Sequence, residues 1–130
     1  MKTDLFTTAR EAMTHAYAPY SKFPVGAALL TDDGRVFSGA NIEVASYPEG
    51  WCAETTALGH YVMAGGGRIM EICVVAEKMD RITPCGGCRQ RLAEFADADT
   101  KLHMCDQNGI VETVTMGDIL PFGFKGDTLK

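Results

Sequence analysis

A run of mostly apolar residues at positions 69–76 constrains the fold of this chain most strongly. It is rich in β-branched side chains, and it lies between two segments with helical character, residues 52–64 and Gly86–Phe95. A short apolar run of this composition predicts a buried central strand. A central strand between two helices predicts a sheet with helices packed against it.

The other segments extend this pattern into a mixed sheet. Turn signals occur at Asp32-Asp33-Gly34 and at Asn108-Gly109, each between two short apolar runs. The remaining predicted elements are a helix over 4–16, hairpin strands over 25–30 and 35–40, and strands over 101–105 and 111–115. The expected order is α-β-β-α-β-α-β-β, an α/β arrangement. The 130-residue length fits a single domain, residues 1–130.

Charge and hydropathy exclude several classes of partner. The net charge is −5 and the twelve Lys and Arg residues are scattered, which argues against a nucleic-acid partner and for a small substrate. No apolar run approaches the roughly 20 residues that a membrane span needs. The first residues, Met1–Leu5, lack the basic and then apolar pattern of a signal peptide, so we expect a cytoplasmic protein.

Five cysteines point to metal chemistry rather than to a disulfide framework, because their number is odd. Cys85 and Cys88 form a Cys-x-x-Cys pair at a predicted helix start, and Cys52 begins another predicted helix. A redox role is the first alternative for the pair. That motif would follow the first strand of a βαβ unit, whereas this one comes after a hairpin and a helix, and a redox role leaves Cys52 unexplained.

A catalytic zinc site explains all three cysteines. Such a site uses three protein ligands, here Cys52, Cys85 and Cys88, and leaves the fourth position to water. Helix N-termini lower the pKa of thiols and so favour the thiolate ligands. Glu54 follows Cys52 by two residues and can move protons without being a ligand. This pattern matches the all-cysteine variant of the zinc-deaminase signature, which indicates hydrolytic deamination.

A structural zinc site is the alternative, and it would need a fourth protein ligand. Candidates for that ligand are His60, His103, Cys73 and Cys105, but none lies at ligand spacing from the other three. Cys73 falls inside the predicted central strand and is expected to be core. A non-enzymatic zinc-binding protein is a further alternative, although such a protein has no need of Glu54. A polynucleotide editor would need a basic groove that the sequence lacks.

With these motifs in hand, the chain resembles the small homotetrameric cytidine deaminases over almost its whole length. The segments that carry the resemblance are 18–29, Asn41–Glu43, 45–48, Cys52–Glu54, Thr83–Gln90 and Ile119–Phe124. The resemblance implies a three-layer α-β-α fold with a five-stranded mixed sheet. It also implies one Zn²⁺ per subunit and hydrolysis of cytidine or deoxycytidine to the uridine product and ammonia in pyrimidine salvage.

The resemblance also implies how a nucleoside would be bound. Asn41 and Glu43 match the pair that hydrogen-bonds the ribose hydroxyls, and residues i and i+2 of a strand point to one side. Phe23 matches an aromatic that packs on the pyrimidine. The backbone around Ala53 and Thr83 matches groups that contact the edge of the base. Taken alone, Phe23 would be a core residue, Asn41 a turn residue and Glu43 an exposed strand charge.

Two aromatic residues match positions at subunit contacts. Phe124 corresponds to an aromatic inserted from a neighbouring subunit, and Tyr47 to an inter-subunit contact. The resemblance thus implies a homotetramer with shared active sites.

Three residues depart from the family pattern. Thr55 follows Glu54 where Arg is usual, and three thiolates on Zn²⁺ leave a net charge of −1. We expect Arg89 and the helix N-termini to offset part of this charge, and the zinc site to be more electron-rich than in relatives. Val44 and Glu49 flank the segment that leads to Cys52. Val44 and Glu49 are either neutral surface and packing changes or changes that reshape the pocket. In the second case they favour, together with Thr55, the alternative function, the same chemistry on another aminated base or nucleoside; the carboxylate of Glu49 would suit a cationic substrate such as blasticidin S.

Overall fold

The computed structural model describes residues 4–79, 81–124 and 126, and it contains one five-stranded sheet of order β2-β1-β3-β4-β5. The strands are β1 (Val25–Thr31), β2 (Val36–Ala40), β3 (Ile69–Ala76), β4 (Ala96–Asp106) and β5 (Gly109–Thr115). The helices are α1 (Leu5–Met13), α2 (Ala53–Met63), α3 (Gly86–Phe95), the short α4 (Met116–Ile119) and the single 3₁₀ turn η1 (Tyr47–Glu49). Residues 1–3 of the N-terminal stretch considered above lie outside the described residues.

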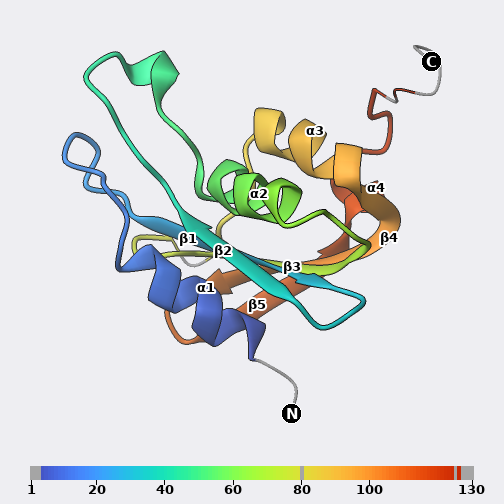
Figure 1. Ribbon diagram of the computed structural model, residues 1–130. Coiled ribbons are helices and arrows are strands. Elements are labelled where there is room, and N and C mark those ends of the chain that lie inside the picture. Colours follow the sequence, from blue (N-terminus) through green and yellow to red (C-terminus); the bar gives the residue numbers. More distant parts are fainter. Residues whose placement is uncertain (1–3, 80, 125, 127–130) are drawn as a thin grey trace.

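Strand directions bring the starts of α2 and α3 together. β1 pairs antiparallel with both β2 and β3, and β3 pairs parallel with β4, so β2, β3 and β4 run in one direction. The α2 helix connects β2 to β3, and α3 connects β3 to β4. Right-handed crossovers that step the same way across a sheet place their helices on the same face. Figure 1 shows α2 and α3 over one face and α1 on the other, which confirms the three-layer α-β-α fold.

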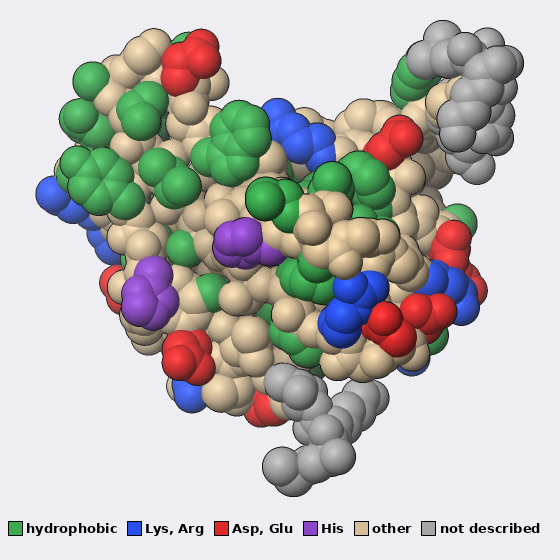
Figure 2. Space-filling view, in the orientation of Figure 1, with side chains coloured by type: hydrophobic (Ala, Val, Ile, Leu, Met, Phe, Trp, Pro, Cys, Tyr) green, Lys and Arg blue, Asp and Glu red, His purple; other side chains and the backbone are tan. Residues whose placement is uncertain are grey.

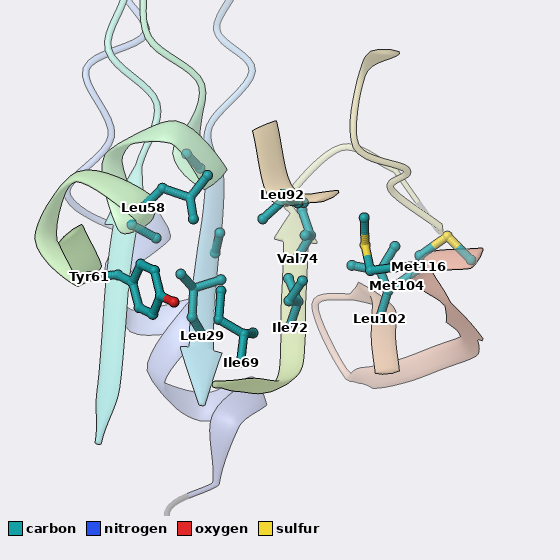
Figure 3. Packing of buried hydrophobic residues seen from close by; sticks show 13 residues of the cluster. Leu29, Leu58, Tyr61, Ile69, Ile72, Val74, Leu92, Leu102, Met104 and Met116 are labelled. Atoms are coloured by element: carbon teal, nitrogen blue, oxygen red, sulfur yellow. The ribbon is translucent and has the colours of Figure 1, made fainter. Parts of the chain in front are cut away.

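The central strand is buried on both faces. Ile72 and Val74 point toward α2 and α3 and join the larger core cluster (Figure 3), whereas Cys73 and Val75 point toward α1 and join the smaller one. Burial on both faces explains why residues 72–76 of this strand are continuously apolar. None of the helices in the described part of the chain has the length and apolar character that a membrane crossing requires.

Gly39 sets how closely α2 lies on the sheet. A Cβ at this position would lie 2.5 Å from the Ala57 nitrogen and 2.7 Å from the Ala53 carbonyl oxygen, both in α2. The absence of a side chain therefore lets the backbone of α2 rest directly on β2. The start of α2, which carries Cys52, is positioned by this contact.

Between β2 and α2 the chain forms an arm, residues 41–52, that projects beyond the sheet (Figure 1). Ile42 pairs with Trp51 across the arm and with Tyr17 of the preceding segment. The η1 turn forms the tip of the arm. Figure 2 shows hydrophobic side chains gathered over the arm and near α2.

Most predicted elements are confirmed, and the differences are local. The 69–76 strand and the Gly86–Phe95 helix have the predicted bounds. The first helix ends at Met13 instead of residue 16, because the backbone N–H groups after it bond three residues back in a tight turn. β4 begins at Ala96, five residues before the predicted start, since its exposed Asp97 and Asp99 hide the strand pattern. The η1 and α4 helices were not predicted.

Candidate metal centre

Three cysteine thiols meet where α2 and α3 begin. The sulfur atoms of Cys52, Cys85 and Cys88 all lie within 4.8 Å of one another, and those of Cys52 and Cys85 are 4.0 Å apart. Zinc–sulfur bonds of about 2.3 Å at tetrahedral angles would place the sulfurs about 3.8 Å apart. The thiol cluster therefore fits a Zn²⁺ ion without rearrangement of the backbone.

Helix capping places these thiols. Cys52 is the N-cap residue of α2 and Cys85 is the N-cap residue of α3, both with extended backbone angles. Cys88 lies three residues later, on the first turn of α3. The unpaired N–H groups and positive dipole ends of two helices therefore face one cluster. Such surroundings stabilise negatively charged sulfur and favour the thiolates that zinc requires.

The thiols interact with one another in the chain without metal. The side-chain hydrogen bond between Cys88 and Cys52 lowers the pKa of Cys52 to about 6, and the contact with Cys85 acts in the same direction. The same bond, together with burial, raises the pKa of Cys88. The pair therefore shares one proton more readily than two separate thiols would, and a metal ion that binds both sulfurs would displace it.

Glu54 lies on the first turn of α2 and is almost fully enclosed, with 4% of its surface exposed. Burial raises the pKa of its carboxyl group to about 7; the negative charge of Cys52 adds to this rise, and Arg91 opposes it. A carboxyl group with this pKa takes up and releases protons readily near neutral pH. The interaction with the charge of Cys52 places this carboxyl group beside the thiol cluster.

The positive charge near the cluster comes from a residue that the sequence analysis did not identify. The expected residue, Arg89, donates instead to the carbonyl oxygens of Pro84 at 2.9 Å and Ile119 at 3.2 Å, because its side chain turns toward α4. Arg91 donates to the sulfur of Cys88 at 3.7 Å and to the hydroxyl of Thr55 at 3.3 Å. The signal for Arg91 was its i, i+3 spacing from Cys88 on one helix.

Asn41 and Glu43 lie in the arm, after β2 has ended at Ala40, and the side chains of both bond to residues of the segment 20–25. Asn41 accepts from the Val25 N–H at 2.9 Å and donates to the Phe23 carbonyl at 2.9 Å. Glu43 accepts from the N–H groups of Tyr20 and Ser21, each at 3.1 Å, and from the Ser21 hydroxyl. The hydroxyl of Ser21 is the main cause that lowers the pKa of Glu43, so this carboxyl group is held as a carboxylate.

Tyr47 and Phe124 leave their aromatic rings on the surface of the single chain. Tyr47 donates from its hydroxyl to Glu43 at 3.2 Å, from the tip of the arm. Phe124 is 63% exposed, and its backbone bonds to the side chain of Gln90 on α3. Phe23 is half-buried beside Asn41. The sequence analysis gave no role to Gln90.

Ala53 and Thr83 lie beside the ligands along the chain. Ala53 directly follows Cys52 and is fully buried at the start of α2. Thr83 is exposed two residues before Cys85. Ala53 is thus the first residue of α2, and Thr83 lies in the loop that leads to α3.

The candidates for a fourth protein ligand have other partners. His60 contacts the Ser38 carbonyl at 2.9 Å, and His103 contacts Glu71 and Thr113, each at 2.7 Å. Cys73 and Cys105 lie in the smaller core cluster against α1, on the opposite face of the sheet. Among the residues that the structure describes, only the thiols of Cys52, Cys85 and Cys88 lie close enough together to hold a metal ion at this place. One coordination position is thus left for water or substrate, which is typical of a catalytic site.

The chain was then compared with known proteins. Residues 1–104 match the family model described as the cytidine and deoxycytidylate deaminase zinc-binding region. A cytidine deaminase of Halalkalibacterium halodurans is 43% identical over 126 residues, which cover 97% of this chain and 96% of that protein.

Solved structures agree with the sequence comparison. The crystal structure of a cytidine deaminase from Burkholderia pseudomallei superimposes with a TM-score of 0.87 at 43% identity, and the match covers 92% of this chain and 96% of that one. A cytidine deaminase from Mycobacterium tuberculosis gives a TM-score of 0.83 at 38% identity, with 92% and 94% coverage.

Proposed function

The chain belongs to the cytidine and deoxycytidylate deaminase family, and from this premise we propose that it hydrolyses cytidine and deoxycytidine to uridine and deoxyuridine with release of ammonia. The observation that carries this proposal is the enclosed carboxyl group of Glu54, with a pKa of about 7, beside three thiols arranged for zinc. Residues 1–130 act as one catalytic domain.

Cys52, Cys85 and Cys88 would hold the ion. When bound, Zn²⁺ supplies a Lewis acid that activates water for attack on C4 of the base. Glu54 takes one proton from the attacking water and delivers it to ring nitrogen N3. Glu54 then takes the proton of the new hydroxyl on C4 and passes it to the amine. The bond between C4 and the exocyclic nitrogen breaks, the amine leaves as ammonia, and the C4 oxygen becomes a carbonyl. One water is consumed, and the C4 amino group is replaced by a carbonyl.

The sugar would be bound by Asn41 and Glu43. An amide side chain has two donor and two acceptor sites. Asn41 uses one of each with residues that the structure describes, and among these residues the second donor and the second acceptor have no partner. A carboxylate has about four acceptor sites. Glu43 fills them with Tyr20, Ser21 and Tyr47. A ribose hydroxyl would therefore replace one hydroxyl partner of Glu43. Tyr47 is the partner most easily exchanged, because its bond of 3.2 Å is the longest of the four and its side chain is exposed at the tip of the arm.

We place Phe23 against the pyrimidine ring and the backbone of Ala53 and Thr83 at its edge. Phe23 lies next to the proposed sugar site through its carbonyl bond to Asn41. Ala53 and Thr83 adjoin the ligand cysteines. The site therefore has a metal end and a sugar end, as a nucleoside requires.

Exposed apolar side chains support assembly into a homotetramer with shared active sites. Met63 is 89% exposed and Trp51 is 53% exposed, and both line an apolar groove along α2 together with Leu58, Val62 and Phe95. Contiguous exposed apolar surface of this kind marks interaction sites. Free cysteines in a metal site need reducing surroundings, which supports a cytoplasmic location.

The test is a set of ultraviolet spectra of zinc-loaded protein with cytidine, deoxycytidine, cytosine, adenosine and blasticidin S. Turnover of cytidine or deoxycytidine, abolished in Glu54→Gln, supports the proposal. No turnover of either nucleoside with zinc bound contradicts it. Val44 and Glu49, both exposed on the arm, would then become the starting points for finding another aminated base.

A further inference from the structure

The thiol cluster concentrates negative charge in a small, partly buried volume. Three thiolates and one divalent cation carry a net charge of −1, and the enclosed Glu54 adds another negative charge when ionised. Buried charge of one sign is costly unless a charge of the other sign lies close by. The helix N-termini contribute only partial charges.

Arg91 brings a full positive charge to this cluster. It lies one turn after Cys88 on α3, and its Nη1 atom donates to the Cys88 sulfur at 3.7 Å. The same atom donates to the Thr55 hydroxyl at 3.3 Å, and that hydroxyl lies 3.8 Å from the Cys88 sulfur. Arg91, Thr55 and Cys88 thus form a closed triangle between the first turns of α2 and α3.

The turn between the ligands is shaped to admit the guanidinium group. A Cβ at Gly87 would lie 3.3 Å from Nη1 and 3.6 Å from Nη2 of Arg91. The guanidinium group therefore lies against the backbone between Cys85 and Cys88, in space that a larger residue would narrow. Thr55 is buried and short, so it leaves room for a side chain that arrives from α3.

From these contacts we propose that Arg91 is a positioning residue that holds and charge-balances the Cys88 thiolate in the zinc site, with Thr55 as the hydroxyl that orients it. This inference rests on the proposed zinc chemistry of the same site. Groups that hydrogen-bond to metal ligands fix the orientation of those ligands and tune the metal. Removal of the guanidinium should therefore weaken zinc binding and leave sulfur more electron-rich.

The test compares four proteins with the wild type. Arg91→Gln removes the charge, Arg91→Lys keeps it, and the exchange variant Thr55→Arg with Arg91→Thr moves the guanidinium from α3 to α2. Arg68→Gln is the matched control, because Arg68 is a surface arginine bonded to Asp97 at 2.6 Å. The apparent dissociation constant for Zn²⁺ is measured against a chromophoric chelator, and the sulfur-to-metal charge-transfer band is recorded with Co²⁺.

Arg91→Gln is expected to weaken Zn²⁺ binding roughly 10–100-fold and to move the cobalt band to longer wavelength. Arg91→Lys and the exchange variant should recover most of the affinity and of the band position, and Arg68→Gln should match the wild type. Arg91→Gln with wild-type affinity and band would overturn the inference. Arg91→Lys with the loss of affinity and the band shift expected for Arg91→Gln would also overturn it. This second comparison remains decisive if Arg91→Gln does not fold.

These readouts are independent of the deaminase reaction. If the wild type binds Zn²⁺ but does not act on cytidine, the proposed function fails. The role of Arg91 is then still decided by the Zn²⁺ dissociation constant and the cobalt band of the variants. If the wild type deaminates cytidine and Arg91→Gln is unchanged in both readouts, only the inference fails.

Discussion

The side-chain amide of Gln90 bonds to the backbone of Phe124 twice: Nε2 donates to the Phe124 carbonyl at 2.8 Å, and Oε1 accepts from the Phe124 N–H at 3.2 Å. Gln90 lies two residues after Cys88 on α3. These two bonds therefore fix the backbone of Phe124 relative to α3, the helix that carries Cys88, although the ring of Phe124 projects into solvent. A fixed backbone with an exposed ring suits a residue that completes a neighbouring subunit's site.

We predict that Phe124→Ala lowers kcat/KM by roughly 10–100-fold, the loss typical of an aromatic anchor at an interface, with zinc content unchanged. Mixing this variant with inactive Glu54→Gln subunits should restore activity, because the second protein supplies Phe124 to the intact Glu54 of the first. Steady-state rates of the refolded mixture measure this. A mixture no more active than the average of its two components would show that Phe124 acts within its own subunit.

Glu54→Gln is predicted to retain one Zn²⁺ per chain and to lose turnover by roughly 10²–10⁴-fold, because the amide cannot accept and release a proton. Metal analysis and single-turnover rates on the same preparation check both parts. Glu11→Gln, the same change on the exposed face of α1, is the control and should behave as wild type. A Glu54→Gln protein with a wild-type rate would remove Glu54 from the mechanism.

Zinc-stripped protein should lose stability as the pH rises, because the pKa of Glu54 is raised from 4.5 to about 7 in the folded chain. The folded state binds this proton more tightly than the unfolded state. The resulting stabilisation is full below pH 4.5 and declines until the pH passes about 7.

The predicted difference amounts to at most about 3 kcal/mol. Urea unfolding of wild type and Glu54→Gln in excess chelator, at pH values across this range, measures the difference together with the coupling between Glu54 and the neighbouring thiols, since titrating groups far from Glu54 cancel in the comparison. Parallel pH curves for the two proteins would contradict the assignment.

Gly39→Ala is predicted to weaken both the fold and the metal site. The added Cβ would lie 2.5 Å from the Ala57 nitrogen, so α2 must move away from β2 and carry Cys52 with it. Overpacking of this kind costs about 1–3 kcal/mol, and the Zn²⁺ affinity should fall as well. Thermal unfolding with and without zinc measures both effects.

Gly59→Ala is the matched control, because it lies within α2 and has open space around it. Replacing glycine by alanine inside a helix stabilises it by roughly 0.5–1 kcal/mol. Equal behaviour of the two variants would mean that the close contact at Gly39 does not position α2.

The zinc ligands could be predicted from the sequence because local spacing determines them. Cys85 and Cys88 share the first turn of one helix, and Cys52 starts the next helix toward the N-terminus, so capping alone brings each thiol to a helix end. That the two helix ends meet depends on β2, β3 and β4 running in one direction, which no local pattern contains. The 69–76 strand was predictable because it is buried on both faces.

The surroundings of the cluster could not be predicted in the same way. Arg89 and Arg91 are two residues apart on α3, and only the packing of α4 against α3 turns Arg89 to the Ile119 carbonyl while Arg91 reaches Cys88. Apart from Tyr47, the side-chain partners of Asn41 and Glu43 are 16 to 23 positions away, in the segment 20–25, beyond any local pattern.

Cys52 and Cys85 are separated by 33 positions, with the whole of β3 between them. Because the ribosome makes the chain from its N-terminus, Cys52 is synthesised well before Cys85 and Cys88. Zinc cannot find its full set of thiols until α3 has emerged. Binding of an ion by all three thiols would thus be possible only late in synthesis, and a nascent chain interrupted before Cys88 would carry an incomplete site.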